Sequence, residues 1–383
     1  SWIILMGRAG LLAKLFGAIG LTAPTIYGRG GIIFVFTLHL FPYIYLYTSG
    51  AMNSIDSSLE EAAENLGMNK LRRIWTVTLP VILPSILAGC IMVFMTCLAD
   101  FCTPMLFGEG YTVLPVLVYN EYMSESATDP YMASCLSVII VFCSLLMLAF
   151  QKLVVDKRNY MMSSLRPPQE TKLRGGKRFL ASLPIYIVGA LAFLPQVVVV
   201  CQSFIERSFS GVIKGINLNN YRTIMARLGQ NIRNTYVFSL VAIVFIVIVG
   251  ILVSYILVRK KGKVANLIDT LIMFPYVIPG SVLGIGLIVA FNRKPVVLVG
   301  TAAIMIISYI IRKLPYTVRS GSAFLYQMDP FVEEASINLG VSPMKTFFTV
   351  TARMMLPGIM SGAVLSWITC INELSSSIML YSG

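Results

Sequence analysis

Residues 56–84 read DSSLEEAAENLGMNKLRRIWTVTLPVILP, and residues 329–357 read DPFVEEASINLGVSPMKTFFTVTARMMLP. Every position of the first stretch lies 273 residues before its counterpart in the second, and no gap is needed. Each stretch starts polar and charged and ends in an apolar run. This repetition of residues and spacing indicates one structural unit that the chain uses twice.

The capping and turn residues of each copy predict two short helices joined by a tight turn. Asp56 and Asp329 are suited to N-capping, because a carboxylate accepts hydrogen bonds from the free N–H groups of a first helical turn. Gly67 and Gly340 stand where a left-handed residue commonly ends a helix. The second helix of each copy then begins after a further N-cap candidate, Asn69 or Ser342.

Apolar residues in each hairpin fall at helical spacing and predict two stripes. The first stripe is expected at Leu59, Ala62, Ala63 and Leu66, with counterparts Val332, Ala335, Ser336 and Leu339. The second is expected at Leu71, Ile74 and Trp75, with counterparts Met344, Phe347 and Phe348. This second stripe completes each unit.

The composition is that of an integral membrane protein. Hydrophobic residues make up 57% of the 383 residues and charged residues 12%, whereas soluble domains are about half apolar and a quarter charged. The mean hydropathy is +0.80. The net charge of +13 is assigned to cytoplasmic loops under the positive-inside rule, and no nucleic-acid partner is predicted.

Long apolar runs predict about eight helical spans, each close to the length that a bilayer requires. They cover residues 28–50, 83–107, 131–153, 179–203, 233–258, 267–291, 296–318 and 355–380. The distribution of Lys and Arg places both hairpins and the segment 152–178 in the cytoplasm and the loop 108–130 outside. The repeat is therefore a parallel one, a known arrangement in transporters.

The repeat also predicts the division of the chain. Residues 1–153 are expected to be the C-terminal part of a first half with about three spans. Residues 154–178 form a basic cytoplasmic linker, and residues 179–383 a second half with about five spans and no last span. The expected fold is all-α and polytopic, with two parallel-repeat halves and a chain truncated at both ends.

Both hairpins resemble the EAA loop of permease subunits in binding-protein-dependent type I ABC importers. The resemblance is carried by Glu61-Ala62-Ala63 with Gly67, and by Glu334-Ala335-Ser336 with Gly340. The fusion of two halves, with RKLPY at 312–316 and ADFCTP at 99–104, is most similar to the ferric-iron permease family. Ser336, Cys102 and the sequence NELS at 372–375 depart from the pattern of that family.

This resemblance implies a transport subunit that is not itself an enzyme. Two copies of an ABC ATPase subunit would dock on the loops, through Glu60, Glu61, Ala62, Ala63, Gly67, Glu333, Glu334, Ala335, Ser336 and Gly340. The chain contains no G-x-x-x-x-G-K-[ST] phosphate loop, so ATP and Mg²⁺ would bind the partner and no cofactor is expected here. An external solute-binding protein would deliver ferric iron at the bacterial cytoplasmic (inner) membrane.

Other cargoes remain open at this point. The same importer class could carry thiamine, an organophosphonate, a polyamine or a sugar phosphate. A different class, an ion-coupled secondary transporter, would require broken helices and coupling carboxylates near the midplane in both halves. Gly280-Ser281, with Gly284 and Gly286, is a possible break of this kind.

Two carboxylates occupy equivalent positions within predicted spans, Asp100 and Glu373. Intramembrane carboxylates are costly and commonly face a cavity or a partner. They can line the translocation path or its gate, or they can serve as structural hydrogen-bond acceptors. The lone His39 and the tyrosines 43, 45 and 47 suggest metal binding only weakly, since an aromatic belt is expected at a membrane boundary.

Overall fold

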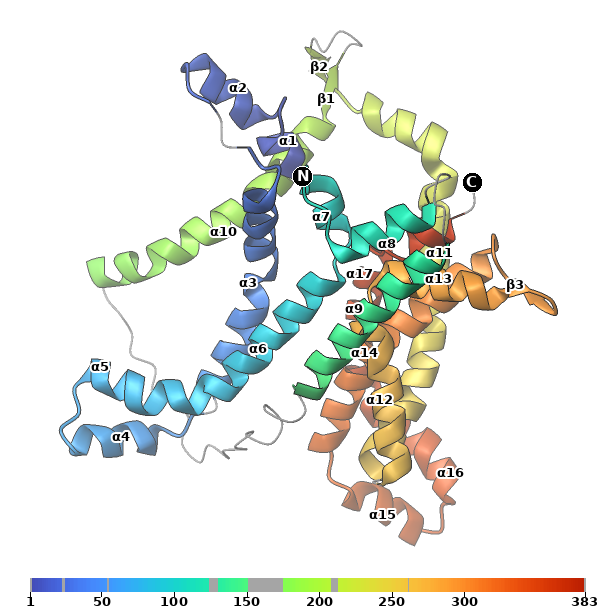
Figure 1. Ribbon diagram of the computed structural model, residues 1–383. Coiled ribbons are helices and arrows are strands. Elements are labelled where there is room, and N and C mark those ends of the chain that lie inside the picture. Colours follow the sequence, from blue (N-terminus) through green and yellow to red (C-terminus); the bar gives the residue numbers. More distant parts are fainter. Residues whose placement is uncertain are drawn as a thin grey trace. The chain divides into compact units, whose positions relative to one another are not determined.

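The computed structural model describes residues 2–22, 25–53, 55–123, 130–150, 175–207, 213–260 and 262–381 (Figure 1). These residues are predominantly helical, which confirms the predicted all-α class. Two short antiparallel hairpins, β1 (Ile205–Arg207) with β2 (Ile213–Ile216) and β3 (Asn292–Arg293) with β4 (Val296–Val297), link helices. Most of the predicted linker, residues 154–174, lies outside the described residues.

The chain divides into two compact units. The first comprises Ser1–Leu117 and Phe142–Thr223, and the second Val118–Val141 and Ile224–Gly383. Helices α8 (Leu114–Met123) and α9 (Pro130–Phe150) each contribute to both. The boundaries expected for the two halves, at 153 and 179, stay a prediction.

The first unit is built around the long helices α3 and α6. Ile26, Ile32, Val35 and Phe107 form a buried cluster at one end of α3. The elements of this unit are α1 (Trp2–Met6), α2 (Leu11–Ala18), α3 (Arg29–Asn53), α4 (Ser57–Asn65), α5 (Lys70–Arg73), the π-helical turn η1 (Ile74–Thr78), α6 (Leu79–Ala99), α7 (Cys102–Phe107) and α10 (Gly176–Ser203).

The second unit repeats this arrangement with α14 and α17. Its elements are most of α11 (Asn219–Arg259), then α12 (Lys263–Val277), α13 (Gly280–Phe291), α14 (Ala302–Gln327), α15 (Phe331–Asn338), α16 (Pro343–Thr346), the π-helical turn η4 (Phe347–Thr351), α17 (Ala352–Ile371) and α18 (Ser377–Leu380). From α3 to η1 and from α14 to η4, the starting residues of the long helices and of the π turns keep the separation of 273 seen in the sequence.

Small residues bring α14 and α17 into close contact. A Cβ atom at Gly358 would lie 2.4 Å from the Cβ of Phe324, and one at Gly362 would lie 2.7 Å from the Cα of Thr317. The Ser320 hydroxyl donates to the Gly358 carbonyl at 2.7 Å. Such small-residue interfaces let helix backbones approach each other in membranes, where hydrophobic burial does not drive association.

Among the described residues, six helices are long and apolar enough to cross a membrane, or seven if one bent pair counts as a span. They cover Arg29–Met52, Lys70–Ala99, Tyr131–Phe150, Arg178–Ser203, Asn219–Arg259 and Pro343–Ile371. The sequence predicted about eight helical spans, and the length and composition of the described helices support six or seven of them.

Two predicted spans account for the difference. The span expected at 267–291 is a bent pair, because α12 and α13 meet at 109° where Ile278 and Pro279 interrupt the helix. The span expected at 296–318 falls in α14, which starts at Ala302 and is more polar than the six candidate spans. Three cations, Arg312, Lys313 and Arg319, make α14 less apolar.

Candidate functional site

The first hairpin has the caps that its sequence predicts. The Asp56 carboxylate accepts the N–H of Ser58 at 2.9 Å and so caps α4. Gly67 then adopts a φ of +77°, and the Asn69 side chain accepts the N–H of Arg72 at 2.9 Å to start α5. These contacts confirm the predicted helix–turn–helix unit.

The second hairpin follows the same plan. Asp329 accepts the N–H of Phe331 at 3.0 Å, Gly340 adopts a φ of +86°, and Ser342 accepts the N–H of Lys345 at 3.4 Å. A Cβ at Gly67 or Gly340 would meet no atom within 4 Å. These two glycines are therefore required by backbone conformation and not by crowding.

The second apolar stripe of each hairpin is mostly exposed. Leu71 and Trp75 are 71% and 69% exposed, and their counterparts Met344 and Phe348 are 70% and 59% exposed. Only Phe347 is buried, where its ring meets Tyr255 edge-on at 4.8 Å. Helices of nine and four residues in the first hairpin, and of eight and four in the second, are too short to cover both stripes. Each hairpin therefore presents an apolar surface.

The four small residues of the motif divide into an inner and an outer pair. Ala63 is buried, and its counterpart Ser336 is half-buried and hydrogen-bonded to the Thr346 hydroxyl at 3.0 Å. Ala62 and Ala335 are exposed. The inner pair holds the hairpin together, and the outer pair gives its surface a shallow, small-residue strip.

The four glutamates also differ in their surroundings. Glu61 and Glu334 are exposed. Glu60 accepts the Thr78 hydroxyl at 3.3 Å, whereas Glu333 forms an ion pair of 3.0 Å with Arg259 at the end of α11. Their predicted role in meeting an ATPase stays a prediction, and the exposed pair is the better placed for it.

Asp100 caps the short helix α7. Its carboxylate accepts the N–H groups of Cys102 at 2.8 Å and Thr103 at 3.2 Å, and the Thr103 hydroxyl donates at 2.6 Å. These are the contacts of the structural alternative. A role for Asp100 in the path stays a prediction.

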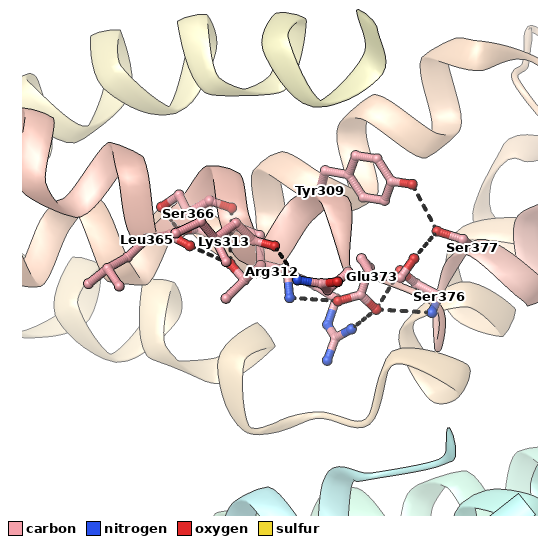
Figure 2. A network of polar contacts seen from close by, with 11 residues as sticks. Tyr309, Arg312, Lys313, Leu365, Ser366, Glu373, Ser376 and Ser377 are labelled. Atoms are coloured by element: carbon pink, nitrogen blue, oxygen red, sulfur yellow. Dashed lines mark hydrogen bonds and ion pairs between the residues drawn. The ribbon is translucent and has the colours of Figure 1, made fainter. Parts of the chain in front are cut away.

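Glu373 plays the equivalent part in the second unit, but within a charge cluster. It accepts the N–H and hydroxyl of Ser376 at 3.2 and 3.1 Å, before α18. Figure 2 shows its carboxylate also facing Arg312, with which it pairs, and Lys313, whose Nζ lies 2.6 Å away. The side chains of Arg312, Lys313 and Glu373 are 12%, 9% and 5% exposed.

Two cations therefore share one carboxylate inside the second unit. A Cβ at Gly280, the first residue of α13, would lie 2.6 Å from Nη1 of Arg312, so the break between α12 and α13 lies against this cluster. The first half offers His39 and Leu40 at the positions of Arg312 and Lys313. The excess of positive charge thus distinguishes the second unit.

Sequence reasoning missed all three ion pairs, those of Glu373 with Arg312 and Lys313 and that of Glu333 with Arg259. A signal existed for Arg312 and Lys313, since adjacent cations inside a predicted span require a carboxylate partner. No comparable signal marked the pairing of Arg259 with Glu333. His39 is exposed, and among the described residues no group of three or more His, Cys, Asp or Glu is placed to hold a metal ion.

Comparison with known proteins shows that this chain is similar to permease proteins of transport systems. The chain is 28% identical to the ferric transport system permease protein FbpB of Actinobacillus pleuropneumoniae, over 99% of this chain and 56% of that protein. It is also 28% identical to a putative ferric transport system permease protein of Haemophilus influenzae, over 99% of this chain and 61% of that one. A molybdate/tungstate transport system permease protein of Pyrococcus furiosus is 30% identical over 39% of this chain and 59% of its own length.

The chain thus spans a little over half the length of the ferric permeases that it matches. The sequence profile of one family matches residues 3–160 and 250–383, which include both hairpins and both carboxylates. This match covers most of the chain. The protein therefore belongs to the family described as the binding-protein-dependent transport system inner membrane component.

Proposed function

We propose that this chain forms the membrane path of an ATP-driven importer and couples to two ABC ATPase subunits through its two hairpins. The observation that carries the proposal is the exposed apolar surface of each hairpin, joined through a π turn to a long apolar helix. An external solute-binding protein delivers the cargo at the bacterial inner membrane. ATP and Mg²⁺ bind the ATPase partners.

The hairpins suit this role by shape and by charge. Exposed Ala62 and Ala335 allow another helix to approach closely, and exposed Glu61 and Glu334 can pair with basic residues of that partner. Each hairpin continues directly into a membrane helix, α6 or α17. Movement of the ATPase subunits on binding ATP would therefore be passed to these helices and would open the path outward.

Ferric iron is the proposed cargo, because two relatives that match nearly the whole chain are named as ferric transport permeases. One observation favours a second candidate in the same importer class. The cluster around Glu373 holds two cations against one carboxylate, which suits an oxyanion or an anionic iron complex. A molybdate/tungstate permease is among the relatives.

The coupling role is tested by substituting the two left-handed glycines. In Gly67→Val with Gly340→Val, a β-branched residue is forced into left-handed backbone, at about 1–2 kcal/mol per site. We expect the complete importer in proteoliposomes to lose stimulation of its ATPase by loaded binding protein, while the chain still inserts. The matched control is Gly67→Asn with Gly340→Asn, since asparagine tolerates this conformation.

Unchanged stimulation in the valine variant would contradict the coupling role. Uptake assays then separate the cargoes, with radioactive ferric iron in one arm and molybdate in the other. Uptake that persists in proteoliposomes lacking the ATPase would instead support the ion-coupled class of transporter.

A further inference from the structure

Helix α11 is much longer than a bilayer requires. Its 41 residues, Asn219–Arg259, correspond to about 60 Å of helix, against a hydrocarbon core of about 30 Å. Residues 236–258 contain no charged side chain and are sufficient for the crossing. The segment 219–235 is therefore in excess of what the crossing needs.

This excess segment is amphipathic. At about 100° per residue, Ile224, Met225, Leu228 and Ile232 share one face, and the first three are 44%, 66% and 49% exposed. Three arginines flank that face on both sides: Arg222, Arg227 and Arg233. No Asp or Glu occurs between Glu206 and Asp269, so the surroundings in sequence are purely cationic.

The start of the segment is tied to the end of another candidate span, α10. The hydroxyls of Ser203 and Tyr221 lie 2.7 Å apart, and the Asn220 amide donates to the carbonyls of Ser203 and Ile205, both at 3.0 Å. The rings of Phe204 and Tyr221 are 5.6 Å apart. Because α10 crosses the membrane and ends at Ser203, these contacts hold the start of α11 at the membrane boundary.

The other end of the segment is held at the same boundary, since the uncharged part of α11 enters the bilayer there. A straight α11 would project these residues out of the bilayer, but Figure 1 shows the first part of α11, next to β2, at an angle to the rest of the helix. With this bend, a stretch of 17 residues whose two ends lie at one membrane surface runs along that surface. Its apolar face then meets the acyl chains and its arginines meet the lipid phosphates, the arrangement of an interfacial helix.

We propose that residues 219–235 form such a helix, lying in the outer headgroup region of the bilayer. Ile224, Met225 and Leu228 insert at the acyl boundary, and Arg222, Arg227 and Arg233 bind phosphate groups of phospholipids. This surface is separate from the two hairpins and does not depend on the cargo.

Tryptophan substitution on the two sides of the segment tests the proposal. Met225→Trp lies on the apolar face, and the matched control Gln230→Trp lies on the opposite side of the helix. The complete chain is reconstituted in phosphatidylglycerol–phosphatidylcholine vesicles with acyl-brominated lipids, and the emission of the unsubstituted chain is subtracted. We expect the bromines to quench the fluorescence of the tryptophan at 225 about threefold more than that of the tryptophan at 230. Acrylamide in the water should quench the tryptophan at 230 more strongly.

Two outcomes would overturn the proposal. Equal access of acrylamide to both positions would show a helix that projects into water. Protection of position 225 from acrylamide without quenching by bromolipid would show that protein covers this face.

The arginines are tested separately by Arg222→Gln with Arg227→Gln, combined with Met225→Trp. Loss of the phosphate contacts should lower the quenching by bromolipid. Arg293→Gln, an exposed change in the β3–β4 hairpin, should leave it unchanged. The assignment of the arginines to phosphate would be contradicted if the quenching by bromolipid fell equally in both variants, or if it fell in neither.

Discussion

At the scale of single residues, the charge cluster in the second unit is the most demanding feature. Arg312 and Lys313 share Glu373 as an acceptor, and all three side chains are nearly buried. Burying a charge without a partner is costly, and removing one member of a buried pair leaves the others uncompensated. Glu373 should therefore matter more for stability than any exposed glutamate of the hairpins.

We expect Glu373→Gln to destabilise the chain by about 3–5 kcal/mol, because two cations then lose their countercharge. The measurement is thermal unfolding of the purified complex in nanodiscs. Glu334→Gln is the matched control, because Glu334 is exposed and pairs with no buried cation. Equal unfolding temperatures for the two variants would show that Glu373 does not neutralise the cluster.

The caps and the cluster differ in how far the sequence could predict them. Asp56, Gly67 and their counterparts act on residues within a few positions, so spacing alone was sufficient. The contact between Arg312 and Glu373 joins residues 61 positions apart. It depends on how α14 packs against the end of α17, and a pattern of hydrophobic residues does not determine that packing.

At the scale of elements, the contact of α14 with α17 gives the second unit its core. Leu325 of α14, Met355 and Ile359 of α17 and Val258 of α11 form one buried cluster at this contact. Glycines at the crossing keep the backbones close. The sequence predicted the helices and offered a possible break at Gly280 and Ser281, which is where α13 begins after the bend. It did not predict the angle, because an apolar run has the same pattern in a straight helix and in a broken one.

The close contact predicts a strong effect from a single methyl group. In Gly362→Ala the new Cβ would lie 2.7 Å from the Cα of Thr317 and 2.8 Å from the Cβ of Ser320. Backbone cannot yield as a flexible side chain can, so we expect a loss of about 1–3 kcal/mol in stability.

Gly286→Ala is the matched control, since a Cβ at Gly286 in α13 would meet no atom within 4 Å. Both variants are compared by thermal unfolding in nanodiscs. If Gly286→Ala were as destabilising as Gly362→Ala, helix propensity or lipid contact would explain the loss, and the close packing of α14 on α17 would not.

At the scale of the whole molecule, the chain carries the same device twice. Both hairpins have the same caps, the same left-handed glycine and the same π turn before the membrane helix. The two hydroxyls that follow the second helix are equivalent as well, with Thr76 donating to the Arg72 carbonyl and Thr349 to the Lys345 carbonyl, both at 2.7 Å. Two equivalent hairpins match the two identical ATPase subunits that we propose as partners.

The proposed stoichiometry gives the last prediction, which substitutes one hairpin at a time. Leu66 and Leu339 are equivalent and are 77% and 85% exposed, next to the left-handed glycines. Leu66→Glu or Leu339→Glu places a charge in an apolar contact that should have excluded water, so each variant should lose one docked ATPase. Native mass spectrometry of the purified complex should then give two ATPase copies for the unsubstituted chain, one for either single variant and none for the double.

Ile216→Glu, an equally exposed change in β2, should keep both copies. A double variant that still holds two ATPase subunits would place the docking surface elsewhere on the chain.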